Sequence, residues 1–259
     1  KIPKKVIEKE SYEFNNFGIK INFGIKVDSK YLKDEILEKY DAVFLATGLN
    51  KDRDYDLNPK NLDNVYQAST FLSSVKKSLI KKIDGVCVTI GGGDTAIDCA
   101  RTALKIGANR SIIAYRRSKE EMPACEVEVL KAVKEGVEFF FLTAPNILKG
   151  DGKVSEIELI RNKLTPMKVG KRRSFTHLSG TEFKLYADFV IFALGKEREQ
   201  PFHDLLSEDN STINPNSLQI GKSKLFAGGD WVNGDKTVVA AVADGKKAAL
   251  SIKKYLKGF

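Results

Sequence analysis

The sequence predicts an α/β fold built on parallel sheets, and three observations lead to this prediction. The first is an apolar strand, Val86–Ile90, that leads into Gly91-Gly92-Gly93 and then into an amphipathic helix. The second is a pair of apolar runs, Ala42–Ala46 and Phe189–Leu194, each ending in small residues, as in strands that are covered on both faces of a sheet. The third is the length of 259 residues, which is enough for two medium-sized domains.

The glycine turn predicts a site for a pyrophosphate. Gly91 permits a tight turn, Gly93 lets the main chain approach a phosphate, and Ala96 lets the helix pack closely on the strand. The predicted site is the run Gly91, Gly92, Gly93, Asp94, Thr95 and Ala96, because N–H groups without partners at a helix start bind anions. An ordinary strand–turn–helix is the alternative, but the strand before the turn and the helix after it favour a nucleotide.

The next predicted strand, Ser111–Tyr115, indicates which nucleotide. A NAD enzyme places an acidic residue at the end of this strand, against the ribose hydroxyls. Here the strand is followed by Arg116 and Arg117, which can bind a 2′-phosphate through charge-assisted, forked hydrogen bonds. The pair therefore favours NADP(H) over NAD(H), with a solvated basic loop as the alternative.

Composition excludes several classes of protein. The net charge is +9, but the lysines are scattered and do not predict nucleic-acid binding, with one local exception at Lys171-Arg172-Arg173. Cys87, Cys99 and Cys125 form no CxxC, so neither a disulfide framework nor a metal site is predicted. No apolar run approaches the roughly 20 residues of a membrane helix, and no signal peptide is present, so we expect a cytoplasmic protein without membrane contact.

The remaining elements follow from periodicity and from glycine or polar breaks. An antiparallel meander, added to the sheet, is predicted between Ile147 and Leu185. The other predicted elements are helices at Lys4–Asn16, Leu32–Glu38, Glu120–Glu135 and Thr237–Leu256, and strands at Ile19–Phe23, Val137–Leu142 and Leu225–Ala227.

Taken in order, these segments resemble the FAD- and NADPH-binding flavoproteins typified by the small subunit of bacterial glutamate synthase. The same module occurs in dihydropyrimidine dehydrogenase and in some ferredoxin:NADP oxidoreductases. The most specific matching pieces are Tyr40–Gly48, Gly91–Ala108, Tyr115–Ser118 with Glu121–Ala124, Glu135–Phe139, and Phe226–Asp230 followed by Thr237–Val239. The resemblance implies two Rossmann-like three-layer domains, with an NADPH domain (75–196) inserted in a FAD domain (1–74 and 197–259).

The resemblance also implies roles for individual residues. Gly91 to Ala96 would hold the NADP pyrophosphate, with Asp94 near the nicotinamide end, and Arg116 and Arg117 would bind the 2′-phosphate. The flavin side would be formed by Ala46, Thr47, Gly48, Asp230, Thr237 and Val238, and Gly195 and Gly229 are further predicted cofactor-binding residues. Among these, Asp230 would bond the ribityl or pyrophosphate portion of FAD, and the backbone N–H groups of Thr237 and Val238 would face the flavin O2 side.

The implied activity is hydride transfer from NADPH to FAD and onward electron transfer to a partner subunit or domain that carries Fe–S clusters. No catalytic side chain is predicted, because the chemistry belongs to the cofactors. The family's first βαβ unit, which binds the ADP part of FAD, and an N-terminal Fe–S domain are expected before residue 1, so we expect a piece of a larger polypeptide with an incomplete FAD domain. The alternatives are a dihydropyrimidine dehydrogenase-like enzyme, a ferredoxin:NADP oxidoreductase, and a non-catalytic nucleotide-binding subunit.

Overall fold

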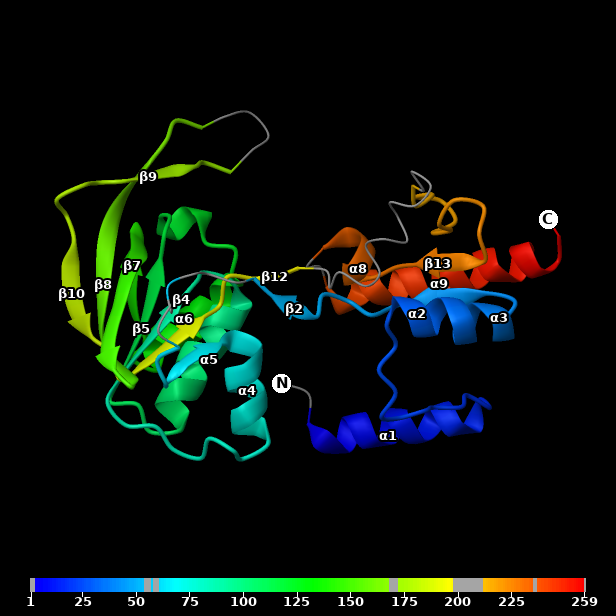
Figure 1. Ribbon diagram of the computed structural model, residues 1–259, viewed down its shortest axis with the longest axis horizontal. Coiled ribbons are helices and arrows are strands. Elements are labelled where there is room, and N and C mark those ends of the chain that lie inside the picture. Colours follow the sequence, from blue (N-terminus) through cyan, green and yellow to red (C-terminus); the bar gives the residue numbers. More distant parts are fainter. Residues whose placement is uncertain are drawn as a thin grey trace. The chain divides into compact units, whose positions relative to one another are not determined.

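Two compact units make up the chain. A computed structural model describes residues 3–53, 57, 61–167, 172–197, 212–234 and 237–258. Unit 1 is formed by Lys1–Ala46 and Glu199–Phe259, and unit 2 by Thr47–Arg198 (Figure 1). Unit 2 thus interrupts unit 1 along the sequence, as in an inserted domain. The predicted first boundary follows residue 74, whereas the compact unit begins at Thr47, because β3 (Val65–Gln67) joins the sheet of unit 2.

A five-stranded parallel sheet is the centre of unit 2. Its order is β3-β11-β4-β5-β6, and every neighbouring pair is parallel. From β4 the chain moves outward through β5 to β6, while β11 lies on the other side of β4, so the strand order reverses between β4 and β11. In open sheets of this kind, ligands bind at the carboxyl ends of the strands where the order reverses. The bounds are β4 Val86–Ile90, β5 Arg110–Tyr115, β6 Glu138–Phe141 and β11 Phe189–Phe192.

Three helices cover one face of this sheet (Figure 1). Cys87 and Ile191 point to that face and pack with Phe71 of α4 and Ala103 of α5. The helices are α4 (Ala68–Lys76), α5 (Asp94–Lys105) and α6 (Glu126–Lys134). Sequence analysis predicts one helix over 120–135, but Pro123 has no N–H to continue it, and the chain forms a short 3₁₀ turn, η2 (Lys119–Glu121), before α6.

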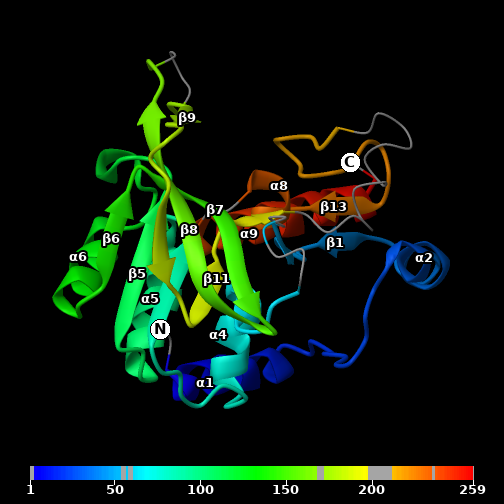
Figure 2. The ribbon, with the colours of Figure 1, turned by 60° about the vertical axis from the view of Figure 1, so that its left-hand side comes forward.

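A separate antiparallel sheet covers the opposite face (Figure 2). Val88 and Val190, which alternate with the helix-facing residues, pack there with Ile157 and Leu159 of the antiparallel sheet. The strands are β7 (Thr143–Asp151), β8 (Lys153–Leu164), β9 (Phe175–His177) and β10 (Phe183–Tyr186). The prediction that the meander extends the main sheet is therefore wrong, because its apolar side chains stack on that sheet instead of continuing its edge.

Unit 1 has a smaller core around a two-stranded parallel sheet, β1 (Val43–Leu45) with β13 (Leu225–Ala227). Trp231 is buried there beside Leu32 and Leu45. The helices are α1 (Lys4–Asn16), α2 (Ser29–Tyr31), a π-helical turn η1 (Leu32–Ile36), α3 (Leu37–Lys39), α8 (Asp230–Asn233) and α9 (Val238–Leu256).

The strand predicted at Ile19–Phe23 is absent from the structure. Its apolar residues are exposed, and Gly18 and Gly24 on either side have positive φ, so the alternating pattern finds no neighbouring strand among the described residues. Helix α1 is confirmed with the predicted bounds.

The chain enters and leaves unit 2 through two short segments that pair with each other. β2 (Lys51–Asp52) and β12 (Lys196–Glu197) form an antiparallel ribbon, and the backbone N–H of Arg53 donates to the carbonyl of Gly195 over 3.1 Å. Lys51 Nζ lies 3.0 Å from Glu197 Oε1.

Candidate functional site: a glycine turn beside an arginine pair

The glycine turn lies at the carboxyl end of β4, where the strand order of unit 2 reverses. Gly91 has φ of +147°, and a Cβ there would lie 2.2 Å from the carbonyl oxygen of Ala193, which follows β11. The N–H of Gly91 donates to the carbonyl of Ala114 over 3.1 Å. Gly91 therefore fixes the turn between the strands, and its N–H is already used inside the protein.

The next two glycines have different surroundings. A Cβ on Gly92 would lie 2.4 Å from the ring of Tyr115, whereas a Cβ on Gly93 would meet no atom within 4 Å. Gly93 is the extended N-cap residue of α5, with φ −92° and ψ 175°. The main chain at Gly93 is therefore open to close approach by a ligand, as the predicted phosphate site requires.

Backbone donors line this space. Among the hydrogen bonds of the described residues, none uses the N–H groups of Gly92, Gly93, Asp94 or Thr95, while the N–H of Ala96 already donates to the carbonyl of Gly93 over 2.9 Å. Ala96 is fully buried against the sheet, as predicted. Unpaired N–H groups at the start of a 12-residue helix can bind an anion, as the predicted pyrophosphate site requires.

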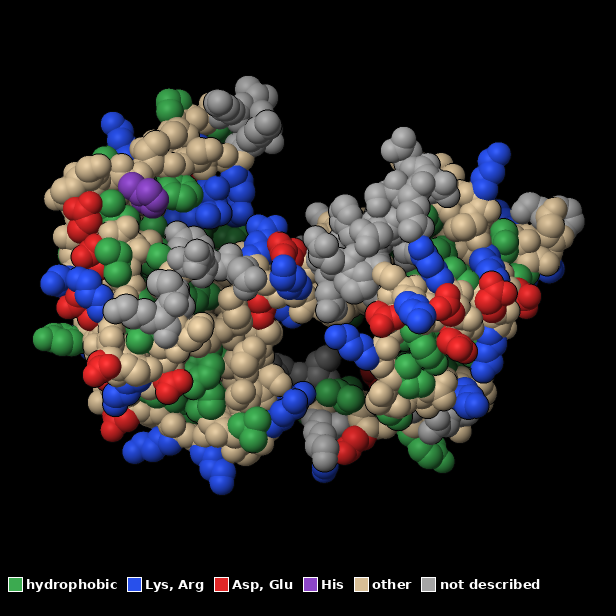
Figure 3. All heavy atoms as spheres, viewed as in Figure 1, with side chains coloured by type: hydrophobic (Ala, Val, Ile, Leu, Met, Phe, Trp, Pro, Cys, Tyr) green, Lys and Arg blue, Asp and Glu red, His purple; other side chains and the backbone are tan. Residues whose placement is uncertain are grey.

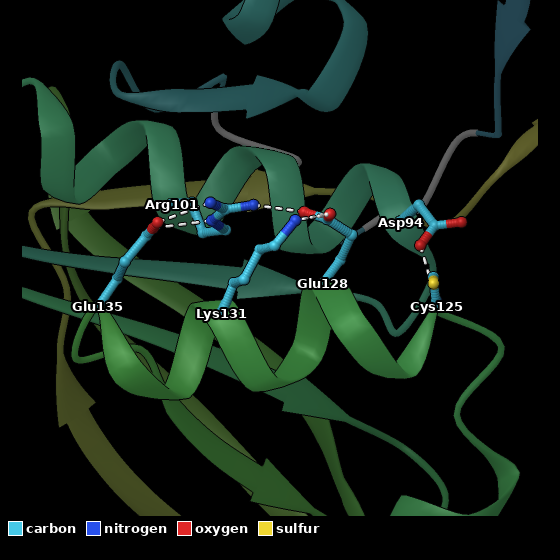
Figure 4. A network of polar contacts seen from close by, with 6 residues as sticks. All are labelled: Asp94, Arg101, Cys125, Glu128, Lys131 and Glu135. Atoms are coloured by element: carbon cyan, nitrogen blue, oxygen red, sulfur yellow. Dashed lines mark hydrogen bonds and ion pairs between the residues drawn. The ribbon is translucent and has the colours of Figure 1, made fainter.

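The segment between η2 and α6 holds the turn in place. The N–H of Ala124 donates to the carbonyl of Gly92 over 3.2 Å, and the N–H of Cys125 donates to Asp94 Oδ1 over 2.8 Å (Figure 4). Tyr115 fills the space beside Gly92 and donates its hydroxyl to the carbonyl of Glu121 over 2.8 Å. The carboxylate of Asp94 thus accepts a hydrogen bond at the start of α6. No role is predicted from the sequence for Tyr115 or Cys125.

A salt-bridge network joins α5 to α6 further along the helices (Figure 4). Arg101 donates Nε and Nη2 to the two carboxylate oxygens of Glu135, at 2.7 and 2.6 Å, and Nη1 to Glu128. The hydrogen bond from Arg101 holds the pKa of Glu135 below its ordinary value, and a hydrogen bond from Lys131 lowers the pKa of Glu128. This network stabilises the helix pair behind the glycine turn.

Arg116 and Arg117 follow β5 directly, at the same edge of the sheet as the glycine turn. Their guanidinium carbons lie 5.1 and 5.9 Å from the ring centroid of Phe175 in β9. The carbonyl of Arg116 accepts a hydrogen bond from Asn162 Nδ2 at 3.0 Å, and Asn162 is buried. The antiparallel sheet thus supports the arginine pair, a contact that the sequence does not indicate.

Gly195 lies at the same edge, two residues beyond Ala193, whose N–H donates to the carbonyl of Ile90 over 2.8 Å. It has φ of +93°, and a Cβ there would meet no atom within 4 Å. The predicted residues Gly91 to Ala96 and Gly195 therefore come together at the edge where β4 and β11 meet.

A second group of predicted residues comes together in unit 1. β1 and β13 are parallel, so Ala46 and the turn at Gly229-Asp230 follow their carboxyl ends at one edge. The N–H of Gly229 donates to Asp244 Oδ2 over 2.8 Å, which ties the turn to α9. Thr237 caps α9, and its hydroxyl accepts from the N–H of Ala240 over 3.2 Å.

These unit 1 residues suit a flavin nucleotide. The N–H of Val238, in the first turn of α9, takes part in no hydrogen bond among the described residues, and Val238 is 78% exposed. The start of a 19-residue helix and a turn aspartate can bind anionic and hydroxyl groups of such a ligand. Thr47 and Gly48 belong to unit 2 and follow β1 in sequence.

The cysteines differ in reactivity. Burial raises the pKa of Cys87 to about 12, against a weaker lowering by Thr89, whereas Cys125 is exposed. Cys99 is buried in α5. Only a thiolate is nucleophilic, so of the three described thiols Cys125 is the one open to alkylation.

In the described part of the chain, no helix is both long and apolar enough to cross a membrane.

The chain is similar to several known oxidoreductases. It is 34% identical to the NADPH glutamate synthase small chain of Escherichia coli K12, over 99% of this chain and 59% of the relative. It is also 34% identical to the beta subunit of the NADP(+)-dependent formate dehydrogenase of Moorella thermoacetica, over 99% of this chain and 38% of the relative. The chain thus spans less than two thirds of the length of these relatives, and the predicted resemblance to the glutamate synthase small subunit is confirmed.

The fold class is confirmed as well. A variant of FprA from Mycobacterium tuberculosis superposes with a TM-score of 0.76, at 19% identity, over 97% of this chain and 73% of that structure. The family model described as pyridine nucleotide-disulphide oxidoreductase matches residues 4–245. Because this match covers most of its length, the chain belongs to the pyridine nucleotide-disulphide oxidoreductase family.

Proposed function

We propose that this chain is the NADPH- and FAD-binding module of an oxidoreductase, which takes hydride from NADPH and passes electrons to a partner subunit. The observation that carries the proposal is the edge of unit 2 where unpaired N–H groups at the start of α5 lie at the same sheet edge as Arg116 and Arg117. The E. coli and M. thermoacetica relatives carry NADPH or NADP(+) in their names, and both are named as a chain or subunit of an enzyme.

Each part of the site has a task in binding. The N–H groups of Gly92 to Thr95 would bind the pyrophosphate, and Arg116 and Arg117 the 2′-phosphate. In unit 1, Gly229, Asp230 and the start of α9 would hold the flavin nucleotide, with Ala46 at the neighbouring strand end. Bound FAD supplies the hydride-accepting ring, and the residues of this chain bind, orient and shield the two cofactors.

The assignment of units to cofactors is part of this proposal. Unit 2 would be the NADPH domain and unit 1 the FAD domain. We further propose that the partner carries Fe–S clusters, that the whole protein works in the cytoplasm, and that its terminal acceptor is the one of a glutamate synthase, with a pyrimidine or ferredoxin as the alternatives.

Titration calorimetry of the chain with NADPH and NADH tests the nucleotide assignment. Charge-assisted contacts to phosphate contribute about 1.5–3 kcal/mol each, so NADPH should bind at least roughly tenfold more tightly than NADH. Arg116→Ala should reduce this preference, and Arg110→Ala, a change to an exposed arginine paired with Glu138, should not. Equal affinity of the unchanged chain for both nucleotides would contradict the assignment.

Flavin absorbance tests the redox assignment. The longer polypeptide that we expect to contain this chain should purify with FAD and lose its visible flavin absorbance on anaerobic addition of NADPH. A longer polypeptide that binds NADPH but never FAD would support the non-catalytic nucleotide-binding subunit instead.

A further inference from the structure

Two more arginines lie beside the segment that follows β5, where Arg173 contacts Arg117 and both Arg172 and Arg173 contact Glu121. Arg172 and Arg173 precede β9, more than fifty residues away in sequence, and Lys171 lies outside the described residues. Arg117 Nε donates to the carbonyl of Arg173 over 2.8 Å. Figure 3 shows Lys and Arg side chains gathered below the arm that contains β9.

One carboxylate joins this group. Arg173 Nε lies 3.0 Å from Glu121 Oε1, and Arg172 Nη2 donates to the backbone carbonyl of Glu121 over 3.0 Å. Arg172 is exposed, while Arg173 is half-buried. Among the salt bridges between described residues, Glu121 is the only carboxylate paired with Arg117, Arg172 or Arg173. Together with Arg116 these three arginines form the arginine cluster, and one carboxylate beside three guanidinium groups leaves positive charge that a dianion would neutralise.

The ring of Phe175 organises the cluster. Arg116 and Arg117 both lie over it, and its edge meets His177 at a centroid distance of 5.6 Å. His177 Nδ1 in turn lies 2.8 Å from Asn162 Oδ1, and Asn162 Nδ2 bonds the carbonyl of Arg116. The cation–π contacts limit the orientations of the two guanidinium groups, and the hydrogen bonds hold the backbone of Arg116.

We infer that Arg172 and Arg173, which directly precede β9, complete the 2′-phosphate site of unit 2, with Arg172 as a third phosphate-binding residue and Arg173 as a positioning residue that orients Arg117. The inference rests on the proposed NADPH function and deepens it. Arg117 already uses Nε on the carbonyl of Arg173, which leaves its Nη groups as the donors for a phosphate. Arg172 has a guanidinium with five donors, and one hydrogen bond to Glu121 leaves others for the same ligand.

The test compares 2′,5′-ADP with 5′-AMP as probes, by calorimetry on the full 259-residue chain. The two probes differ by the 2′-phosphate alone. Arg172→Ala should weaken 2′,5′-ADP by about tenfold and leave 5′-AMP unchanged. Arg173→Met keeps the carbonyl that Arg117 binds but removes the salt bridge to Glu121 that holds this carbonyl in place. It should therefore weaken 2′,5′-ADP selectively when Arg117 is present, and have less effect in a protein that already carries Arg117→Ala.

Arg110→Ala is the matched control, since it removes an exposed arginine of β5 at the opposite end of the strand from Arg116. Thermal unfolding of each variant separates loss of folding from loss of binding, and Arg172→Lys provides a folded variant that keeps the charge but not the fork. If the unchanged chain prefers 2′,5′-ADP and Arg172→Ala keeps the full preference, the inference is wrong while the NADPH proposal stands. If the unchanged chain shows no preference for 2′,5′-ADP, both are wrong.

Discussion

Replacement of Gly93 by alanine separates binding from folding at the glycine turn. The new Cβ would meet no protein atom within 4 Å, and the backbone at φ −92° suits any residue. Loss of backbone freedom in the unfolded chain stabilises the variant by about 0.4–1 kcal/mol, and alanine at an N-cap costs up to about 1 kcal/mol. The free energy of unfolding should therefore change by less than about 1 kcal/mol, or roughly 2–4 °C in Tm.

Binding should respond differently, because the Cβ enters the space that a phosphate would occupy. Loss of one charge-assisted hydrogen bond costs about 1.5–3 kcal/mol, which corresponds to a Kd for NADPH that rises roughly tenfold or more. Gly92→Ala is the contrasting variant, because its Cβ would lie 2.4 Å from the Tyr115 ring. Overpacking of this kind costs about 1–3 kcal/mol, so Tm should fall. Calorimetry and thermal unfolding of both variants check the argument, and a Gly93→Ala protein with normal NADPH affinity would refute it.

Three further predictions concern the surroundings of the site. Arg101→Met should lower Tm at pH 7, and this loss of Tm should shrink as the pH falls below about 4.5. The pKa of Glu135 is lowered in the folded chain, so its pairing with Arg101 contributes stability only while the carboxylate is ionised. Tm measured across pH checks this. Iodoacetamide at pH 8 should modify Cys125 and spare Cys87, with NADPH slowing the reaction, as peptide mass mapping would show; labelling of Cys87 in the folded chain would contradict the burial argument. In the longer polypeptide that we expect to contain this chain, Asp244→Ala should weaken FAD binding without affecting NADPH, because it removes the contact that holds the turn after β13. Unchanged flavin affinity in a binding titration would argue against that turn as part of the FAD site.

Local sequence patterns predicted the parts of the site that depend on a few adjacent residues. The run from β4 through Gly93 into α5 is one continuous pattern of burial, turn and amphipathic helix, and the structure forms it as expected. The position of Arg116 also follows from its place directly after β5. Thr237 likewise occupies the N-cap of the predicted final helix.

The sequence pattern does not predict contacts between distant segments. The contact of Arg173 with Arg117 depends on how the antiparallel sheet stacks on the parallel one, and periodicity within each strand does not specify that stacking. The same holds for Tyr115, whose ring position beside Gly92 arises from the turn and from the segment before α6. The alternating residues at 19–23 gave a false strand, because alternation alone does not supply a neighbouring strand.

The ribbon formed by β2 and β12 has a consequence for the ancestry of the molecule. Because Lys51 and Glu197 lie together, the two ends of unit 2 emerge next to each other. A host protein can receive such a domain within a single loop. The insertion adds little to the entropic cost of closing that loop, because the ends of the inserted domain already lie together. Recombination within this loop would thus replace one version of unit 2 by another and leave the host fold intact.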